Sequence, residues 1–133
     1  MTSPSRVPAR IGAEAEHLVA DALVAAGWTI LGRNVRLGRR ELDLVAVDPG
    51  PPASLVIVEV RWRRSRLHGY PEETVDRGKV LRLREGAGRL AASDALPDGT
   101  PLPHLPVRVD LVAVEPGPGG RTAMRHHRHA LSG

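Results

Sequence analysis

Two acidic residues lie in the most apolar segments of the chain, where an unpaired charge is costly. Asp43 and Glu59 each fall within a run rich in Val, Leu and Ile, and a Pro- and Gly-rich turn over residues 48–52 separates the two runs. This pattern predicts an antiparallel hairpin. If Val47 pairs with Leu55 beside the turn, Asp43 faces Glu59, and side chains opposed in this way have Cβ atoms about 5 Å apart.

Two like charges at that separation destabilise a sheet unless a positive charge lies between them. A divalent cation meets this need, because Mg²⁺ in proteins is usually bound by one or two carboxylates together with water and phosphate oxygens. Two alternatives stay open at this point. Arg61 and a neighbouring arginine could pair with both acids, with Glu41–Arg61 as an ordinary cross-strand salt bridge. A one-residue change of register would separate Asp43 from Glu59 altogether.

A third carboxylate, Glu16, lies on a predicted helix over residues 12–26. At about 100° per residue, Glu16 falls on the apolar side of this helix, beside Val19 and Leu23. The solvent-facing side carries Glu14, His17 and Asp21. A carboxylate among apolar side chains needs a partner, so Glu16 is a candidate site residue. The alternative is that Glu16 reaches solvent or meets an arginine.

The remaining pattern predicts an α/β fold, with a mixed central β-sheet flanked by helices. We expect a disordered tail over 1–9 and a single domain over 10–133. The expected elements are a helix over 12–26, extended pieces over 28–31 and 35–37, strands over 41–47 and 55–62, a helix over 71–92, a loop over 93–106, a strand over 107–114 and an edge strand over 121–131.

Composition narrows the classes of function. The 133-residue chain has a net charge of +4 and a pI of about 10.9, which favours a polyanionic partner such as nucleic acid, although an arginine-rich composition is also typical of GC-rich genomes. It contains no Cys, which excludes disulfides and thiolate metal sites, and no Phe, so the core must consist of Leu, Val and Ala. No apolar run is long enough to span a membrane, and we expect a cytoplasmic protein.

Basic residues flank the predicted acidic pair and could follow a phosphate backbone. The candidates for nucleic-acid contact are Arg33, Arg36, Arg40, Arg63, Arg64 and Lys79, the only lysine. A solvated basic surface explains the same run of charges. Lys79 lies on the predicted second helix and could reach the site in place of a lysine at position 61, but an ordinary surface role is the simpler interpretation. The His126–His129 run invites a transition-metal interpretation, but the interposed Arg128 repels a cation, which favours a polar edge or tail.

Several short motifs fall in order along the chain: Ala15-Glu16, Arg33-Asn34, Arg40-Glu41-Leu42-Asp43-Leu44-Val45, Val58-Glu59-Val60-Arg61, Lys79 and Arg108-Val109-Asp110-Leu111-Val112. Together they resemble the uncharacterised bacterial YraN-like family, over residues 10 to 131. The resemblance implies a restriction-endonuclease-like fold, similar to Holliday-junction resolvases, with a PD-(D/E)XK-type site. It implies Asp43 and Glu59 as ligands of Mg²⁺ or Mn²⁺, with the Val60 carbonyl as a further ligand and Glu16 in a supporting role.

Arg61 departs from the family pattern, because it stands where the site lysine belongs. Arginine stays protonated at any working pH, so Arg61 can bind a phosphate or orient water but cannot accept a proton. Two hypotheses follow. The protein is a metal-dependent endonuclease on structured DNA, or it is a catalytically silent module of the same fold that binds nucleic acid or protein. A homodimer is expected by analogy with resolvases.

Overall fold

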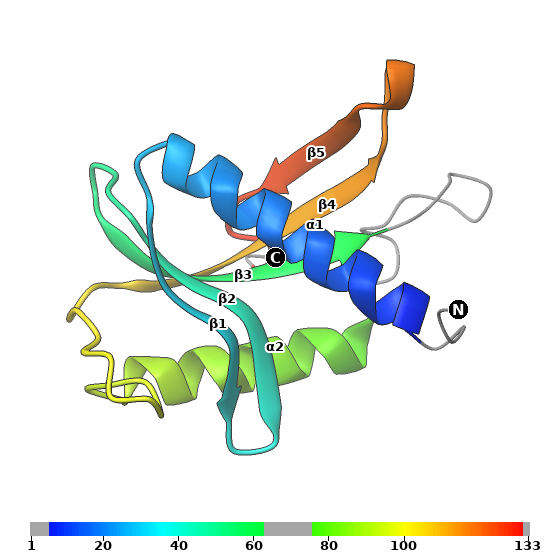
Figure 1. Cartoon of the computed structure of the whole chain (residues 1–133). Coiled ribbons are helices and arrows are strands. Elements are labelled where there is room, and N and C mark those ends of the chain that lie inside the picture. The colour runs from blue at the N-terminus through cyan, green and yellow to red at the C-terminus, as the bar shows by residue number, and fades with distance from the viewer. Residues whose placement is uncertain (1–5, 63–75, 132–133) are drawn as a thin grey trace.

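The chain folds into one five-stranded sheet with two helices, in agreement with the alternation of apolar and polar residues in its strands. The computed structural model describes residues 6–62 and 76–131, with side chains from residue 12 onward (Figure 1). Its elements are α1 (Arg6–Ala25), β1 (Thr29–Leu37), β2 (Arg40–Asp48), β3 (Ser54–Trp62), α2 (Arg77–Ala91), β4 (Val107–Pro116), a 3₁₀ turn (Pro118–Gly120) and β5 (Thr122–His127).

The strand order in the sheet is β1-β2-β3-β4-β5. Strands β3 and β4 are parallel, and the other neighbouring pairs are antiparallel. A parallel pair needs a long crossover connection, and the chain between β3 and β4 contains α2. The predicted mixed sheet with flanking helices is therefore confirmed. No helix in the described part of the chain has the length and hydropathy needed to cross a bilayer.

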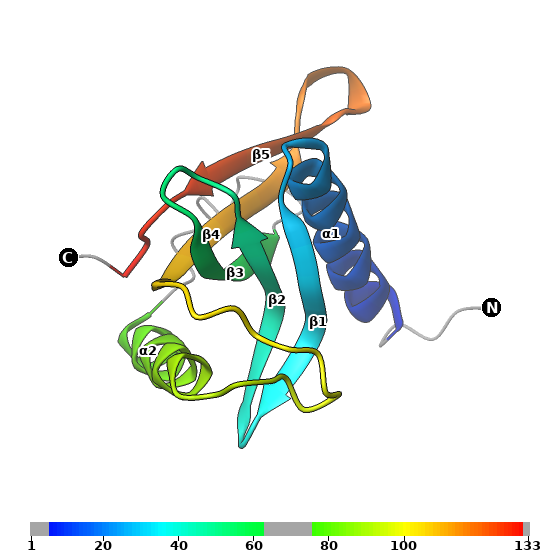
Figure 2. The same ribbon diagram turned by 90° about the vertical axis from the view of Figure 1, so that its left-hand side faces the viewer.

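The two helices cover opposite faces of the sheet (Figures 1 and 2). Because successive side chains of a strand point to opposite faces, β3 contributes to both cores. The α1 core contains Ala15, Val19, Leu23, Trp28, Leu44, Ala46, Val56, Val58, Val112 and Val114. The α2 core contains Val35, Leu42, Val45, Leu55, Ile57, Leu83, Leu90, Leu96, Leu102 and Val109. The expectation of a core built from Leu, Val and Ala is confirmed, apart from Trp28 and Ile57.

Several element boundaries differ from the sequence prediction. Helix α1 begins at Arg6, so residues 6–9 are helical, where a loose tail was expected. The two predicted extended pieces form one strand, β1, with a register irregularity between Ile30 and Gly32. Strand β5 ends at His127, so the final edge strand is shorter than the expected 121–131. For β1 and β5 the extent of the strand depends on pairing with β2 and β4, which local sequence does not specify.

Helix α2 begins later than the proline at position 71 suggested. Asp76 has an extended backbone and its carboxylate accepts a hydrogen bond from the Lys79 amide, which makes Asp76 the N-cap. The helix therefore starts at Arg77, and the predicted start at Pro71 lies outside the described residues. This boundary places Lys79 in the first turn of α2.

Candidate metal and nucleic-acid site

The hairpin register brings Asp43 and Glu59 together. Strands β2 and β3 pair from Asp48↔Ser54 to Leu44↔Val58, and the expected pair Val47↔Leu55 is one of them. Continued by one position, this register places Asp43 beside Glu59. The predicted neighbourhood of the two acids is confirmed, although the backbone ladder itself ends one position earlier.

Strand β2 leaves the regular ladder at Asp43. The backbone amide of Val60 donates a hydrogen bond to Asp43 Oδ2 at 2.9 Å, so a side chain replaces the usual carbonyl acceptor. Leu42 and Val45 both belong to the α2 core, whereas Leu44 belongs to the α1 core, so the alternation of side chains breaks here. Such a break redirects a side chain at the point where two strands begin to separate.

Burial makes this acidic pair electrostatically unstable. The side chain of Glu59 is almost fully buried, and its Oε2 has no hydrogen-bond donor among the described residues. Burial raises the pKa of Asp43, and the adjacent Glu59 raises it further, to about 7, against the opposing hydrogen bond from Val60. Two carboxylates in contact favour a shared proton or a bound cation over two free negative charges.

Among the described residues, the cation nearest to Glu59 is Lys79, from α2. Its Nζ lies 3.0 Å from Glu59 Oε1, and the lysine side chain is only 22 % exposed. Arg61 is the second neighbour, with Nε at 3.7 Å from the same oxygen, and this Nε has no hydrogen-bond partner in the described part of the chain. The interpretation of Lys79 as an ordinary surface lysine is therefore wrong, because it forms an ion pair with a buried site residue.

Glu16 points from α1 toward the same region. Its side chain is half-buried and hydrogen-bonds to Asn34 on β1. Burial raises the pKa of Glu16, and the charge of Asp43 raises it further, against the opposing hydrogen bond with Asn34. The predicted solvent-facing residues of this helix, Glu14, His17 and Asp21, are exposed.

These donors fit a Mg²⁺ or Mn²⁺ ion that takes its remaining ligands from water and substrate. The unpartnered Glu59 Oε2 and the adjoining Asp43 carboxylate provide two oxygen donors. No group of three or more His, Cys, Asp or Glu residues suited to a metal occurs in the described residues. A two-carboxylate set is typical of Mg²⁺ sites completed by phosphate oxygens, whereas a closed protein cage would need more ligands.

The predicted nucleic-acid-binding arginines have varied surroundings. Arg33 contacts His17 (3.2 Å), Arg36 pairs with Glu41 (3.4 Å), and Arg40 forms two hydrogen bonds with Glu85 (2.8 and 3.0 Å). Arg63 and Arg64 lie outside the described residues. The suggested Glu41–Arg61 salt bridge is wrong, since Glu41 pairs with Arg36 on β1 instead.

A second charged cluster, not foreseen from the sequence, lies near the ends of β2 and β4. Arg108 is buried, and its guanidinium donates to Asp48 (2.8 Å) and to both oxygens of Asp110 (2.8 and 3.0 Å). His126 Nε2 lies 2.8 Å from Asp110, and Arg128 lies 3.5 Å from Asp48. The His126–His129 run therefore contributes to an ion network, and His126 serves it as the partner of a buried aspartate.

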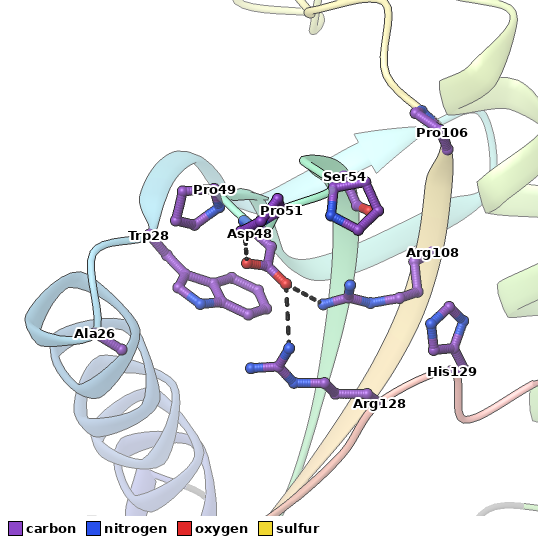
Figure 3. A pocket seen from close by; sticks show the side chains of 12 residues that line it. Ala26, Trp28, Asp48, Pro49, Pro51, Ser54, Pro106, Arg108, Arg128 and His129 are labelled. Carbon is purple, nitrogen blue, oxygen red and sulfur yellow. Dashed lines mark hydrogen bonds and ion pairs between the residues drawn. The ribbon is translucent and has the colours of Figure 1, made fainter.

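This cluster borders a cavity of about 560 Å³ between the end of α1 and the β2–β3 loop. Figure 3 shows Arg108 and Arg128 converging on Asp48 beside the Trp28 ring. The Arg108 and Arg128 guanidinium carbons lie 5.6 and 5.9 Å from the Trp28 centroid, within cation–π range. The wall also includes Pro49, Pro51 and Pro106 (Figure 3).

The aspartates of this network stay charged. Burial alone would raise the pKa of Asp110, but hydrogen bonds from His126, Arg108 and the His129 amide hold it below its usual value. At Asp48, too, burial alone would raise the pKa. Hydrogen bonds from the Gly50 amide and from Arg108 outweigh this effect, so the pKa of Asp48 is also lowered. The sequence does contain a signal for this network: Arg108 and Asp110 stand two residues apart, and hence on one face, in a strand whose other residues from Val107 to Val114 are apolar.

The fold and the site together define an α/β protein with a mixed five-stranded sheet between two helices and an acidic pair, Asp43 and Glu59, at the end of the β2–β3 ladder. A profile of the Uncharacterised protein family UPF0102 matches residues 15–114. A UPF0102 protein of Symbiobacterium thermophilum is 43 % identical over 122 residues, covering 92 % of this chain and 96 % of its own. Another, from Beutenbergia cavernae, is 41 % identical over 120 residues, covering 89 % and 92 %. The chain belongs to the UPF0102 family, which confirms the resemblance to YraN-like proteins.

Proposed function

We propose that this protein is a nucleic-acid-binding protein with a restriction-endonuclease-like, PD-(D/E)XK-type site, and that it hydrolyses phosphodiester bonds in structured DNA with Mg²⁺ or Mn²⁺. The observation that carries the proposal is the contact between Asp43 and Glu59, two carboxylates brought together where β2 and β3 separate. Such a pair costs stability in the free protein, which is typical of functional sites.

In this proposal Asp43, Glu59 and the Val60 carbonyl hold the metal, and Glu16 supports the site from α1. A bound divalent cation lowers the pKa of water and stabilises charge on the phosphate. Arg61, with its guanidinium beside Glu59, is suited to bind a phosphate oxygen. Arg61, which stands in the position of the usual site lysine, is therefore assigned to phosphate binding. In this proposal a different residue supplies the amine that the site lysine would provide.

Lys79 is that residue in our proposal. Its Nζ already lies 3.0 Å from Glu59 Oε1, so an amine reaches the site from α2 even though β3 offers an arginine. A compact ammonium on a flexible stem can orient a water molecule beside the carboxylates. In this position Lys79 takes the role of the lysine that is missing at position 61.

The test is a cleavage assay on branched and linear DNA with Mg²⁺ or Mn²⁺. We expect Asp43→Asn, Glu59→Gln and Lys79→Met each to lower the rate at least tenfold, while Glu14→Gln, an exposed acid on the outer side of α1, keeps the wild-type rate. Cleavage unaffected by both Asp43→Asn and Glu59→Gln would contradict the site.

The second candidate function is a silent module that binds nucleic acid or protein without turnover, and the observation in its favour is Arg61 in place of the usual lysine. Calorimetry with Mn²⁺ separates the two, because binding that Glu59→Gln abolishes supports the metal site, whereas no binding at millimolar Mn²⁺ favours the silent module. The homodimer and the cytoplasmic location stay predictions.

A further inference from the structure

We infer that a basic pocket beside the acidic pair binds a backbone phosphate of the nucleic-acid strand, next to the phosphate at the metal site. The pocket lies between the β1–β2 turn and the first turns of α2. Its lining residues are Arg39, Arg40, Glu41, Leu42, Lys79, Arg82 and Leu83. Four of these seven side chains are cationic and one is acidic, so the lining favours an anion.

Ion pairs already formed within the protein leave two of these cations available. Arg40 is bonded to Glu85 at 2.8 and 3.0 Å, and Lys79 is paired with Glu59 at 3.0 Å. The acid of the pocket does not neutralise the others, since Glu41 pairs with Arg36 on β1.

Arg39 and Arg82 are exposed, and no ion pair joins either of them to a carboxylate within residues 6–62 and 76–131. Two guanidinium groups from different elements therefore face one small pocket without a charge partner there. A guanidinium fork matches the geometry of phosphate oxygens.

The volume of the pocket limits the size of the anion that it can bind. The pocket volume is about 200 Å³. This space admits a phosphate group with some of its hydration and is below the usual range for a drug-sized ligand, roughly 300–1,000 Å³. The helix that forms one wall begins at Arg77, and the positive end of its dipole adds to the attraction for an anion.

Lys79 connects the pocket with the acidic pair. It lines the pocket and its Nζ contacts Glu59, so a single side chain separates the two places. A phosphate bound by Arg39 and Arg82 would therefore lie close to a phosphate at Asp43 and Glu59, as neighbouring phosphates of one strand do. The identification of the anion as a nucleic-acid phosphodiester rests on the proposed function, whereas the binding of a phosphate group does not.

The experiment measures binding without metal. In EDTA, the affinity for a short fluorescein-labelled DNA duplex is followed by anisotropy between 50 and 200 mM salt for the wild type, Arg39→Ala, Arg82→Ala and the double variant. Each phosphate contact lowers duplex affinity roughly 3.5-fold across this fourfold salt range. We expect the double variant to bind more weakly and to lose about that factor from its salt dependence. The control Arg121→Ala removes an exposed arginine at the β4–β5 turn and should match the wild type.

Three results would overturn the inference. The first is a double variant with wild-type affinity and salt dependence, and the second is a control that loses as much affinity as the double variant. The third comes from thermal unfolding, in which inorganic phosphate is compared with chloride at equal ionic strength. If phosphate stabilises the wild type but not the double variant while duplex binding is unchanged, the pocket takes a free phosphate and not a strand. Because metal is absent, these readouts are independent of whether the protein cleaves DNA.

Discussion

Replacing Asp43 by asparagine removes one of two adjoining negative charges while keeping the shape of the side chain. The asparagine oxygen can still accept the hydrogen bond from the Val60 amide, and its NH₂ group can donate to Glu59, whose Oε2 has no donor in the described structure. We therefore expect Asp43→Asn to stabilise the metal-free protein at alkaline pH, even though it removes a proposed metal ligand.

The pKa of Asp43 sets the size and sign of this effect. The carboxyl has a pKa of about 7 when folded and an ordinary value of 3.8, so between these values the folded protein holds a proton that the unfolded chain has released. Stability from this group therefore falls as the pH rises from about 4 to about 7. From pH 5 to pH 7 this is two pH units at ~1.36 kcal/mol each, about 3 kcal/mol. Since Asp43 is half-buried, solvent screening reduces our expectation to about 2 kcal/mol.

The assay is urea unfolding of both proteins at pH 5 and pH 8 in EDTA. Titrating groups that do not interact with Asp43 affect both proteins alike, so the difference between the two free energies of unfolding reports on Asp43 and the acids beside it. We expect the advantage of Asp43→Asn to grow by about 2 kcal/mol from pH 5 to pH 8. A constant difference, or a variant that becomes relatively less stable at pH 8, would refute the electrostatic argument. Millimolar Mn²⁺ at pH 8 should then stabilise only the wild type.

Three further predictions concern the rest of the molecule. Arg108→Ala leaves two buried aspartates without their main cation and should lower the free energy of unfolding by about 3–5 kcal/mol. Urea unfolding measures this loss. A loss below about 1 kcal/mol would show that the two aspartates do not depend on Arg108 for their stability. The pKa of Asp110 is lowered, so its contribution is present above the ordinary value of 3.8 and is lost as the pH falls through the folded-state pKa. Asp110→Asn should accordingly be less stable than the wild type at pH 7, with a gap that narrows in an acid titration; a gap that widens would contradict the sign. Asp76→Ala should cost about 1 kcal/mol by loss of the α2 N-cap, whereas Asp76→Asn should keep the cap, and thermal unfolding of the pair tests this.

Much of the fold was predictable because local patterns dictate it. The turn between β2 and β3 is rich in Pro and Gly, so the hairpin register followed from pairing Val47 with Leu55 on either side of it. The same register predicted the meeting of Asp43 and Glu59. The ends of α1 and α2 were less predictable, because neither the extra turns from Arg6 nor the cap at Asp76 follows from the spacing of apolar residues.

Contacts between distant segments were beyond the reach of these patterns. Lys79 reads as a surface residue along its helix, and only the packing of α2 against the sheet brings its amine to Glu59. Likewise, the sequence around the histidines near the C-terminus does not indicate their partners. The pairing of β5 with β4 places His126 beside Asp110.

The sequence by itself determined the acidic pair, the basic character and the sheet that carries them, because side-chain alternation and turn chemistry act over a few residues. Only the tertiary structure decided which cations compensate the buried acids: Lys79 for Glu59, and Arg108 for Asp48 and Asp110. The physical reason is that buried charges interact over distances in space, and the separation of their residues along the chain does not limit them.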